Sequence, residues 1–305
     1  MNKIVLYGAG KRGHGMYEFL KNIHYSDLIY GFCDKKAKEI ITIDDKKVWA
    51  PEELENEEVT YCITLLDESE RIRVENEIGT EKCIDFSELA EMVGMDRIEF
   101  NRSFCAFYHI RGMDTYFEEA EDLLEIFWDV NSDFFQLFKQ LNLEKVIELG
   151  CGRGRHIPNY IKEAGEITLV DILQENIDFC RERFFNETKV KYYRNTGYDL
   201  LELKSNAYTA VYSYDAMVHF ELMDIYSYLK DIYRILQQGG RALLHHSNYY
   251  ENYKADFSNA PGSRNFMSKE CFAYLAYRVG FTVVEQKVID WNGVKNLDCI
   301  TLLEK

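Results

Sequence analysis

Two series of short apolar runs, each alternating with helical patterns, divide the chain into two parts. In the first part, runs typical of strands cover Lys3–Tyr7, Leu28–Phe32, Val59–Leu65 and Lys82–Phe86. Helical periodicity falls between some of them, at Lys11–Asn22 and Asp67–Ile78. Strands that alternate with helices predict a parallel sheet covered by helices on both faces. We therefore expect residues 1–97 to form a small, doubly wound α/β unit.

A helical stretch rich in Phe, Leu and Trp follows. It covers roughly Met113–Trp128 and Ser132–Leu141. Only three prolines occur in the chain, and no Gly/Ser/Pro-rich linker separates its parts. We therefore expect residues 98–142 to be an ordered bridge or lid rather than a loose tether.

The alternation restarts after the bridge. Strand-like runs cover Lys145–Leu149, Glu166–Asp171, Val190–Asn195, Ala210–Tyr214 and Arg241–His246. Helices are predicted from about His156, over Gln174–Phe185 and over Ile225–Leu236. Two further extended runs, Val283–Ile289 and Leu297–Leu303, flank a turn-forming segment, which is typical of a hairpin. Residues 143–305 thus predict a second, larger α/β unit.

Composition and charge narrow the class of protein. The 305 residues are 47% hydrophobic, which is ample for buried cores and excludes general disorder. The formal net charge of -16 argues against a protein that coats nucleic acid or an anionic membrane. No apolar run reaches the 18 or so residues that a membrane span needs. We expect small-molecule partners, no nucleic acid and no membrane span, and a homo-oligomer remains open.

The cysteines and the first residues bear on the compartment. Eight cysteines are scattered along the chain without a C-x-x-C pair, which favours buried thiols in a reducing compartment over a disulfide framework or a zinc site. The start of the chain lacks the apolar stretch and cleavage site of a signal peptide. We therefore expect a cytoplasmic protein. No spacing of histidines, cysteines or carboxylates indicates a metal.

The clearest chemistry lies in the second unit. The run Val146–Leu149 leads into Gly150-Cys151-Gly152-Arg153-Gly154. A ligand over the carboxyl end of a parallel strand needs a turn without side chains in its way. The next strand ends in Asp171, whose carboxylate can accept hydrogen bonds from both hydroxyls of a ribose. The third strand ends in a polar turn, Asn195-Thr196-Gly197-Tyr198, and the fourth ends beside the same crevice at Asp215.

At this point residues 113–305 resemble the class I S-adenosylmethionine-dependent methyltransferases. The resemblance implies a seven-stranded sheet with a terminal antiparallel strand, and S-adenosyl-L-methionine as cofactor. It implies that the glycine loop lines the methionine portion, with Glu148 near its ammonium, and that Asp171 holds the ribose. The cofactor-binding set is then Glu148, Gly150, Gly152, Gly154, Asp171, Asn195, Thr196, Gly197, Tyr198 and Asp215. Many relatives have an acidic residue where Thr196 stands.

Three histidines are candidates for the catalytic base. A hydroxyl acceptor must lose a proton, and histidine suits that role near neutral pH. The candidates are His219, after Asp215, and His245 and His246 at the end of a strand. Neighbouring strand residues point to opposite faces, so only one of His245 and His246 faces the crevice unless the strand has ended. The alternative for each is a hydrogen-bonded wall residue.

Two segments also resemble motifs of a bacterial small-molecule methyltransferase subgroup. They are His245-His246-Ser247-Asn248 and Arg264-Asn265-Phe266-Met267-Ser268. The resemblance implies that Asn248 and Arg264 border the acceptor pocket. The Arg264 fork suits a phosphate or carboxylate; the alternative is a salt bridge that holds the C-terminal helix.

The first unit carries its own glycine loop, Gly8-Ala9-Gly10-Lys11-Arg12-Gly13. It follows a strand and opens a helix, and Asp34 closes the next strand, as nucleotide-binding loops require. The unit resembles the nucleotide-binding head of bacterial sugar acyltransferases and of some polysaccharide methyltransferases. This implies a nucleotide or nucleotide-sugar at Gly8, Gly10, Gly13 and Asp34. A structural or oligomerising role and redox use of NAD are the alternatives.

Together the patterns and the two resemblances imply an enzyme with a Rossmann-like head. We expect methyl transfer from S-adenosylmethionine to a small polar acceptor, a hydroxyl on a sugar or phosphate-bearing precursor in polysaccharide biosynthesis at a bacterial surface. Two alternatives stand beside it: a non-catalytic nucleotide-binding sensor or scaffold, and an NAD-dependent oxidoreductase.

Overall fold

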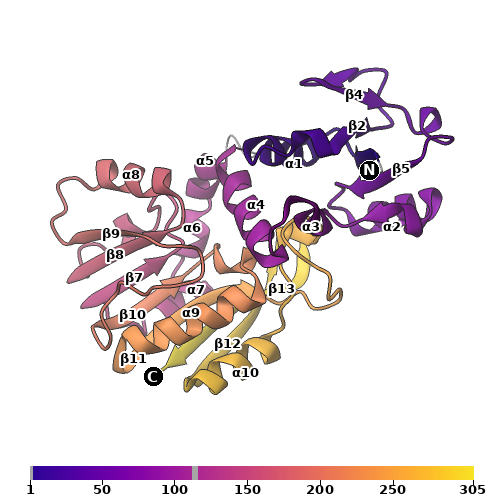
Figure 1. Cartoon of the computed structure of the whole chain (residues 1–305). Helices are drawn as coiled ribbons and strands as arrows, with labels where there is room; N and C mark the ends of the chain where they lie inside the picture. Colours follow the sequence, from indigo (N-terminus) through magenta and orange to yellow (C-terminus); the bar gives the residue numbers. More distant parts are fainter. Residues whose placement is uncertain (1–2, 112–115) are drawn as a thin grey trace. The chain divides into compact units, whose positions relative to one another are not determined.

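The chain folds into two units, each built around its own sheet. The computed structural model describes residues 3–111 and 116–305. The N-terminal unit contains residues up to 114 together with 255–263, and the C-terminal unit contains 115–254 and 264–305. The predicted helix Met113–Trp128 begins at residues 113–115, which lie outside the described residues. Each unit is treated separately below (Figure 1).

The sheet of the N-terminal unit has six strands among the described residues. They are β1 (Lys3–Tyr7), β2 (Ile29–Cys33), β3 (Thr42–Ile43), β4 (Lys46–Trp49), β5 (Val59–Ile63) and β6 (Cys83–Ile84). Their order is β3-β4-β2-β1-β5-β6. Only the β3–β4 pair in this sheet is antiparallel. The apolar pattern predicts β1, β2, β5 and β6; it misses β3 and β4, whose short, lysine-containing sequences present no apolar run.

Helices cover both faces of this first sheet. They are α1 (Lys11–Asn22), α2 (Glu68–Ile78), α3 (Leu89–Val93) and α4 (Arg97–Arg111), with 3₁₀ turns at Ser26–Leu28, Pro51–Glu53, Thr80–Lys82 and Phe86–Glu88. Helices α1, α3 and α4 share an apolar core with Ile4, Leu6 and Phe32. The other face packs Val5 and Tyr7 with residues that include Val74 of α2. In Figure 1, α4 crosses close to α1, which it contacts.

A segment from late in the sequence completes the N-terminal unit. Residues 255–263, which include the 3₁₀ turn Pro261–Ser263, belong to it. The ring of Phe257 packs edge-on against Phe104 and Tyr108 of α4, at centroid distances of 5.7 and 6.0 Å. The predicted bridge, residues 98–142, is therefore divided between the units, with α4 in the N-terminal unit.

The second sheet has seven strands among the described residues. They are β7 (Lys145–Leu149), β8 (Glu166–Asp171), β9 (Val190–Arg194), β10 (Tyr208–Ser213), β11 (Leu236–Ser247), β12 (Thr282–Trp291) and β13 (Val294–Glu304). Their order is β12-β13-β11-β10-β7-β8-β9. The β13 strand runs antiparallel to both β11 and β12, whereas the other pairs are parallel. The predicted fold class, two α/β units with a terminal antiparallel strand in the second, is confirmed.

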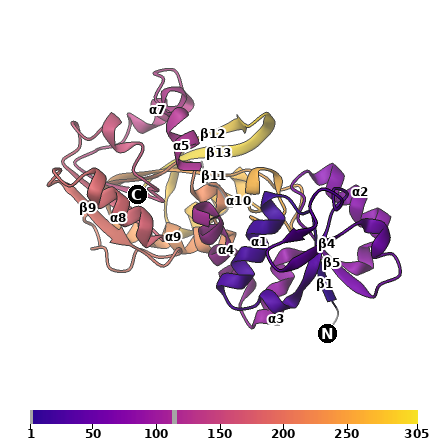
Figure 2. The ribbon, with the colours of Figure 1, turned by 90° about the horizontal axis from the view of Figure 1, so that it is seen from above.

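Helices also cover both faces of the second sheet. They are α5 (Tyr116–Asp122), α6 (Leu124–Phe127), α7 (Asp133–Phe138), α8 (Gln174–Arg183), α9 (Leu222–Ile235) and α10 (Lys269–Val279). One core joins α6, α7 and α8 to the sheet, and the other joins α9 and α10 to the opposite face. Figure 2 shows α7 and α9 on opposite sides of the strands. None of the helices within the described residues is long and apolar enough to span a membrane.

One predicted helix is wrong. The segment from His156 forms only the 3₁₀ turn Ile157–Asn159 and further turns before β8. Pro158 lies in the first turn, where its missing N–H is tolerated, so it does not account for the absence of a regular helix. The glycine loop of the C-terminal unit therefore leads into tight turns rather than into a helix.

Candidate functional site

The loop after β7 bends the chain sharply at the carboxyl end of the sheet. Gly150 and Gly152 have φ values of +72° and +52°, in the region that favours glycine. A Cβ at Gly150 would lie 2.6 Å from the Cβ of Ala216, so no side chain fits there. Gly154 also has a positive φ, and a Cβ there would lie 2.6 Å from the Phe184 ring. The loop thus brings bare backbone to the end of the strand, as the sequence predicts.

Glu148 is buried one residue before the end of β7. Its Oε2 atom has no hydrogen-bond partner among the described residues. Burial raises the pKa of this carboxyl to about 8, although a hydrogen bond with Tyr212 and the charge of Arg155 act in the opposite direction. A buried carboxylate oxygen without a partner costs free energy unless a ligand satisfies it. A cationic group, such as the ammonium of S-adenosylmethionine, has the chemistry to do so.

Asp171 closes β8 and holds the neighbouring backbone. Its carboxylate accepts hydrogen bonds from the N–H of Gly152 at 2.9 Å and of Leu173 at 2.9 Å, and from Nδ2 of Asn176 at 3.2 Å. Burial raises its pKa to about 6, and these three hydrogen bonds limit the rise. Asp171 therefore fixes the glycine loop, and its role toward a ribose stays a prediction.

The turn after β9 presents a mixture of buried and exposed groups. Asn195 is buried; its Nδ2 donates to the Tyr228 hydroxyl at 2.6 Å, and its Oδ1 has no partner among the described residues. Gly197 is buried with a positive φ, whereas Thr196 and Tyr198 are exposed. The Thr196 hydroxyl donates to Asp199, a buried carboxylate that the sequence analysis did not single out. Asp199 brings an acidic group to this turn, three residues after Thr196.

Asp215 is held by contacts from two directions at the end of β10. Its φ is +56°, which is uncommon for a residue other than glycine. Its N–H donates to Nδ1 of His245 at 3.0 Å, and its carboxylate pairs with Arg155 at 2.8 Å. Arg155 also donates to the carbonyl of Ala120 in α5 at 2.9 Å. This arginine, which sequence reasoning missed, ties α5 to the carboxyl end of the sheet.

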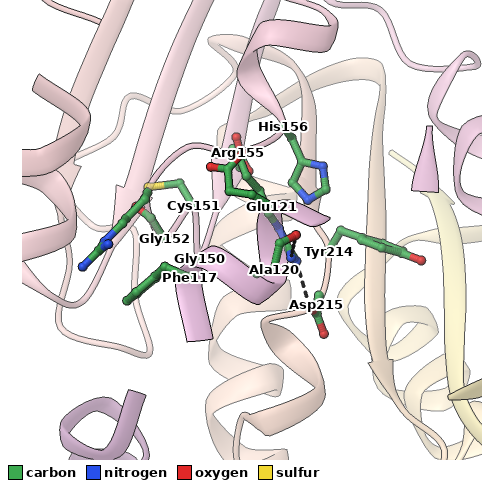
Figure 3. Close-up of a pocket in the computed structure, with 12 residues that line it drawn as sticks. Phe117, Ala120, Glu121, Gly150, Cys151, Gly152, Arg155, His156, Tyr214 and Asp215 are labelled. Carbon is green, nitrogen blue, oxygen red and sulfur yellow. Dashed lines mark hydrogen bonds and ion pairs between the residues drawn. The ribbon is translucent and has the colours of Figure 1, made fainter. Parts of the chain in front are cut away.

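A pocket forms where these elements meet (Figure 3). Figure 3 shows the Arg155–Asp215 ion pair and the ring of Tyr214 extending away from the glycine loop. The lining includes the predicted Glu148, Gly150, Gly152 and Asp215; Gly154, Asp171 and the turn at 195–198 lie outside it. The lining residues that the sequence analysis did not assign are Phe117, Ala120, Glu121, Cys151, Arg153, Arg155, His156 and Tyr214. Arg153 and Arg155 flank Gly154, the last glycine of the loop, in the sequence. This position was the sequence feature that could have identified them as pocket residues.

The rings of His245 and His246 are both fully buried and hydrogen-bonded through both nitrogens. His245 accepts at Nδ1 from Asp215, which assigns its proton to Nε2, 3.1 Å from Asp298 Oδ2. His246 lies 2.8 Å from both the Ser247 carbonyl and the Thr301 hydroxyl. Burial lowers its pKa to about 3. To act as a base, either ring would have to give up a hydrogen bond within the wall.

His219 occupies a different environment. It ends the 3₁₀ turn Met217–His219, after Asp215, and is half-buried. Its carbonyl accepts from Asn265 Nδ2 at 2.6 Å. The structure thus places the three candidate histidines at the carboxyl ends of β10 and β11, and their catalytic roles stay predictions.

Asn248 and Arg264 both bond to the C-terminal strands. Asn248 donates to the Asn296 carbonyl at 2.9 Å and accepts from the Lys269 N–H at 2.9 Å. Arg264 is 3% exposed and donates from Nε and Nη2 to the two oxygens of Asp298, at 3.0 and 2.5 Å. Burial alone would raise the pKa of Asp298, but hydrogen bonds from Arg264 and His245 hold it below its ordinary value. The fork of Arg264 is thus directed to a carboxylate of the protein, and a role at the acceptor stays a prediction.

The glycine loop of the N-terminal unit has a comparable backbone. Gly8 has a φ of +116°, and a Cβ at Gly13 would lie 2.0 Å from the Gly8 carbonyl oxygen. Asp34 accepts from the N–H of Ala9 at 2.7 Å and of Lys36 at 2.8 Å. Gly10 precedes α1, and a Cβ there would meet no atom within 4 Å. The predicted residues Gly8, Gly10, Gly13 and Asp34 therefore come together, and their ligand stays a prediction.

Comparison with known proteins bears on the C-terminal unit. The methyltransferase domain family matches residues 147–244. No curated protein matches the chain. Similar solved structures include an S-adenosylmethionine-dependent methyltransferase from Mesorhizobium loti, with 14% identity over 57% of this chain and 97% of that one and a TM-score of 0.46. Another is a protein from Pyrococcus horikoshii, with 19% identity, 61% and 98% coverage and a TM-score of 0.44.

A third similar structure is the geranyl diphosphate C-methyltransferase from Streptomyces coelicolor, with 13% identity, 55% and 76% coverage and a TM-score of 0.45. The domain match spans β7 to β11, from the strand that carries Glu148 to the strand that carries His245. The match of residues 147–244 to the methyltransferase domain family confirms the predicted enzyme class, an S-adenosylmethionine-dependent methyltransferase.

Proposed function

We propose that this methyltransferase acts on a hydroxyl of a small polar acceptor, a sugar-type precursor of a bacterial surface glycan. The proposed use of S-adenosylmethionine rests on Glu148 beside the glycine loop. Its buried Oε2 atom has no hydrogen-bond partner among the described residues. Two acceptor types follow from the sequence, a sugar and a phosphate-bearing molecule. The pairing of Arg264 with Asp298 supports the sugar, because the arginine expected to meet a phosphate is already matched.

The cofactor, when bound, supplies a methyl group on a sulfonium, which is transferred by in-line displacement. Glu148 would hold its ammonium and Asp171 its ribose, while the turn at Asn195–Tyr198 borders the adenine. Phe117 and Ala120 of α5 line the same pocket and would exclude water from it. Holding the nucleophile and the methyl group close together in a dry site can supply much of the rate.

We propose His219 as the base that takes the hydroxyl proton. His219 is half-buried, whereas His245 and His246 are fully buried, and this difference in exposure favours His219. The test is the pH profile of kcat for methyl transfer to a panel of sugars, in the wild type and in His219→Gln and His245→Gln. His219→Gln should lower kcat by about 100-fold and leave S-adenosylhomocysteine affinity within about twofold. An unchanged kcat in His219→Gln would exclude His219 as the base.

The ribose assignment has a separate test. Asp171→Ala should weaken S-adenosylhomocysteine binding by a few kcal/mol, because hydrogen bonds to a charged carboxylate are lost. Asp34→Ala is the matched control in the other unit, where it removes the equivalent carboxylate and should leave this affinity unchanged. Calorimetric titration of both variants decides the point. Equal affinities in Asp171→Ala and the wild type would remove Asp171 from the site.

For the N-terminal unit we propose a nucleotide or nucleotide-sugar ligand. The tight turn at Gly8, the bonding of Asp34 to Ala9 and the start of α1 at Lys11 support this proposal. Calorimetric titration with UDP-sugars and with NAD tests it. Binding of a UDP-sugar that Asp34→Ala abolishes would support it, whereas binding of NAD alone would favour a dinucleotide ligand.

A further inference from the structure

A second hollow of the C-terminal unit begins beside the cofactor pocket. We call it the aromatic groove, and its lining residues come from α6, α7 and the tip of the β12–β13 hairpin. Tyr214 lines both this groove and the pocket at the glycine loop. The groove and the cofactor pocket are therefore neighbours.

One wall of the groove is a continuous aromatic surface. The rings of Phe127 and Trp291 are stacked, with centroids 5.7 Å apart and an interplanar angle of 18°. Tyr214 packs edge-on against Phe127 at 5.0 Å and lies 4.2 Å from Phe134. Trp291 is half-buried and lines the groove. A flat aromatic wall suits a ring that presents C–H groups on one face, because such a face is apolar and weakly electropositive.

The rim of the groove is polar and acidic. Asp133, Asp290 and Asn292 line it and are exposed. Their oxygens can accept hydrogen bonds from hydroxyl groups. No lysine or arginine occurs among the described residues that line the groove. The rim therefore suits a neutral, hydroxyl-rich molecule and would repel a phosphate.

Arg264 is a cation close to the groove, but it is already paired with a carboxylate of the protein. The Arg264 guanidinium lies 5.4 Å from the centre of the Trp291 ring, and its fork bonds to Asp298. It therefore supports Trp291 from within the protein. This arrangement leaves the aromatic groove without a free positive charge from Arg264.

We propose that the aromatic groove binds the methyl acceptor as an uncharged pyranose ring, stacked on Trp291 and hydrogen-bonded to Asp133 and Asp290. The proposal rests on the proposed function, of which it specifies the substrate class. It predicts that a phosphate on the ring weakens binding, which is the opposite of what Arg264 in the sequence suggests.

Saturation-transfer NMR on the full chain with saturating S-adenosylhomocysteine tests the site. The probes are the methyl glycosides of glucose, galactose, mannose and rhamnose, each compared with a phosphorylated counterpart. At least one neutral glycoside should bind, and Trp291→Ala should weaken it by about tenfold because the stacking surface is lost. Trp49→Ala, which removes a half-buried tryptophan of the N-terminal unit, is the matched control and should leave binding unchanged.

The rim carboxylates give a second test. Their removal should change the affinity of neutral and phosphorylated probes in opposite directions. Asp133→Asn and Asp290→Asn should weaken the neutral glycoside a few-fold, because an amide is a weaker acceptor than a carboxylate. The same changes should strengthen binding of the phosphorylated probe, because a repulsive charge is removed. Both residues are exposed, so these variants are expected to fold.

Three outcomes would overturn the proposal. They are binding of no neutral glycoside, retention of binding in Trp291→Ala, and tighter binding of the phosphorylated probes. Methyl transfer to a cell-extract component with no Trp291-dependent glycoside binding would overturn the groove's assignment and leave the methyltransferase function standing. Trp291-dependent binding of a glycoside without methyl transfer to any sugar would show a glycoside site in the groove and overturn its assignment as the acceptor site, together with sugar O-methylation.

Discussion

The two glycine loops of this protein have similar backbone conformations but differ in the side chains around them. In both, a glycine with positive φ follows a buried strand, and an aspartate from the next strand accepts a loop N–H: Asp34 from Ala9, and Asp171 from Gly152. Aligned on Gly8 and Gly150, Leu6 of the N-terminal unit corresponds to Glu148 of the C-terminal unit. The apolar residue completes a core, whereas the acidic one leaves a buried oxygen unpartnered.

The same alignment sets Arg12 against Gly154. Gly154 keeps space for the ring of Phe184, but Arg12 is buried and donates to the carbonyl of Phe257 and the hydroxyl of Ser263. The rings of Tyr108 and Phe257 lie 4.7 Å from its guanidinium carbon. A glycine-rich turn therefore shows only that the backbone is tight. The second loop differs in having an acidic side chain directly at the end of its strand, with one buried oxygen that has no partner among the described residues, where the first loop has Leu6.

The largest effect on cofactor affinity is expected when Glu148 is replaced with leucine, the residue at the corresponding position 6 of the N-terminal unit. Glu148→Leu should weaken S-adenosylhomocysteine binding roughly ten- to hundredfold, the worth of a hydrogen bond to a charged group. The same change should not lower thermal stability, because it removes a buried carboxylate that lacks a full set of partners. Calorimetric titration and thermal unfolding measure the two effects.

Glu148→Gln is the control for shape, since it keeps the volume and removes the charge. It should lose most of the same affinity if charge is what the site supplies. Full cofactor affinity in Glu148→Leu would mean that the unpartnered oxygen has no ligand, and the comparison of the two loops would lose its basis.

The next largest effect is expected at Arg12. Arg12→Ala should lower the free energy of unfolding of the N-terminal unit by about 3 kcal/mol, through a cavity among aromatic rings and the lost hydrogen bonds. Arg12→Lys should not restore it, because an ammonium cannot reproduce the planar fork. Chemical denaturation of the full chain is the measurement. If Arg12→Ala kept its stability and lost nucleotide binding, Arg12 would be a phosphate ligand rather than a structural residue.

Much of the fold could be predicted because apolar runs report burial directly. The bounds of β1, α1, β7 and β8 follow from their sequence pattern, and the seven-stranded sheet follows from the resemblance. The hairpin of β3 and β4 could not be predicted, since its strands have two and four residues with lysines among them.

Partners distant in the sequence account for what the site analysis missed. Arg264 meets Asp298, and Arg155 meets Asp215, 34 and 60 residues away. Such pairs depend on which strands become neighbours, which no local pattern encodes. For the same reason the ring environments of His245 and His246 could not be separated from the sequence. A residue type suggests a chemistry, but the partner decides whether it is used.

The stability without cofactor is also expected to depend on pH. Burial raises the pKa of Glu148 to about 8 from an ordinary value of 4.5, so the folded state holds a proton that the unfolded state has lost between these pH values. The free energy of unfolding should therefore fall as pH rises from about 4.5 to about 8. Glu148→Gln should flatten this slope, and thermal unfolding across the range measures it. An identical slope in Glu148→Gln would assign the dependence to other groups.

The smallest effects are expected at the second glycine of each loop. Gly10 has an ordinary φ of -80° and open space around its Cβ position, so Gly10→Ala should change stability by less than about 0.5 kcal/mol. Gly152 has a φ of +52°, so Gly152→Ala should cost about 1 kcal/mol. If a nucleotide phosphate approaches the first loop, Gly10→Ala should weaken UDP-sugar binding without changing stability. Unchanged UDP-sugar affinity would mean that the ligand does not approach Gly10. The open space at this glycine would then not be a binding site.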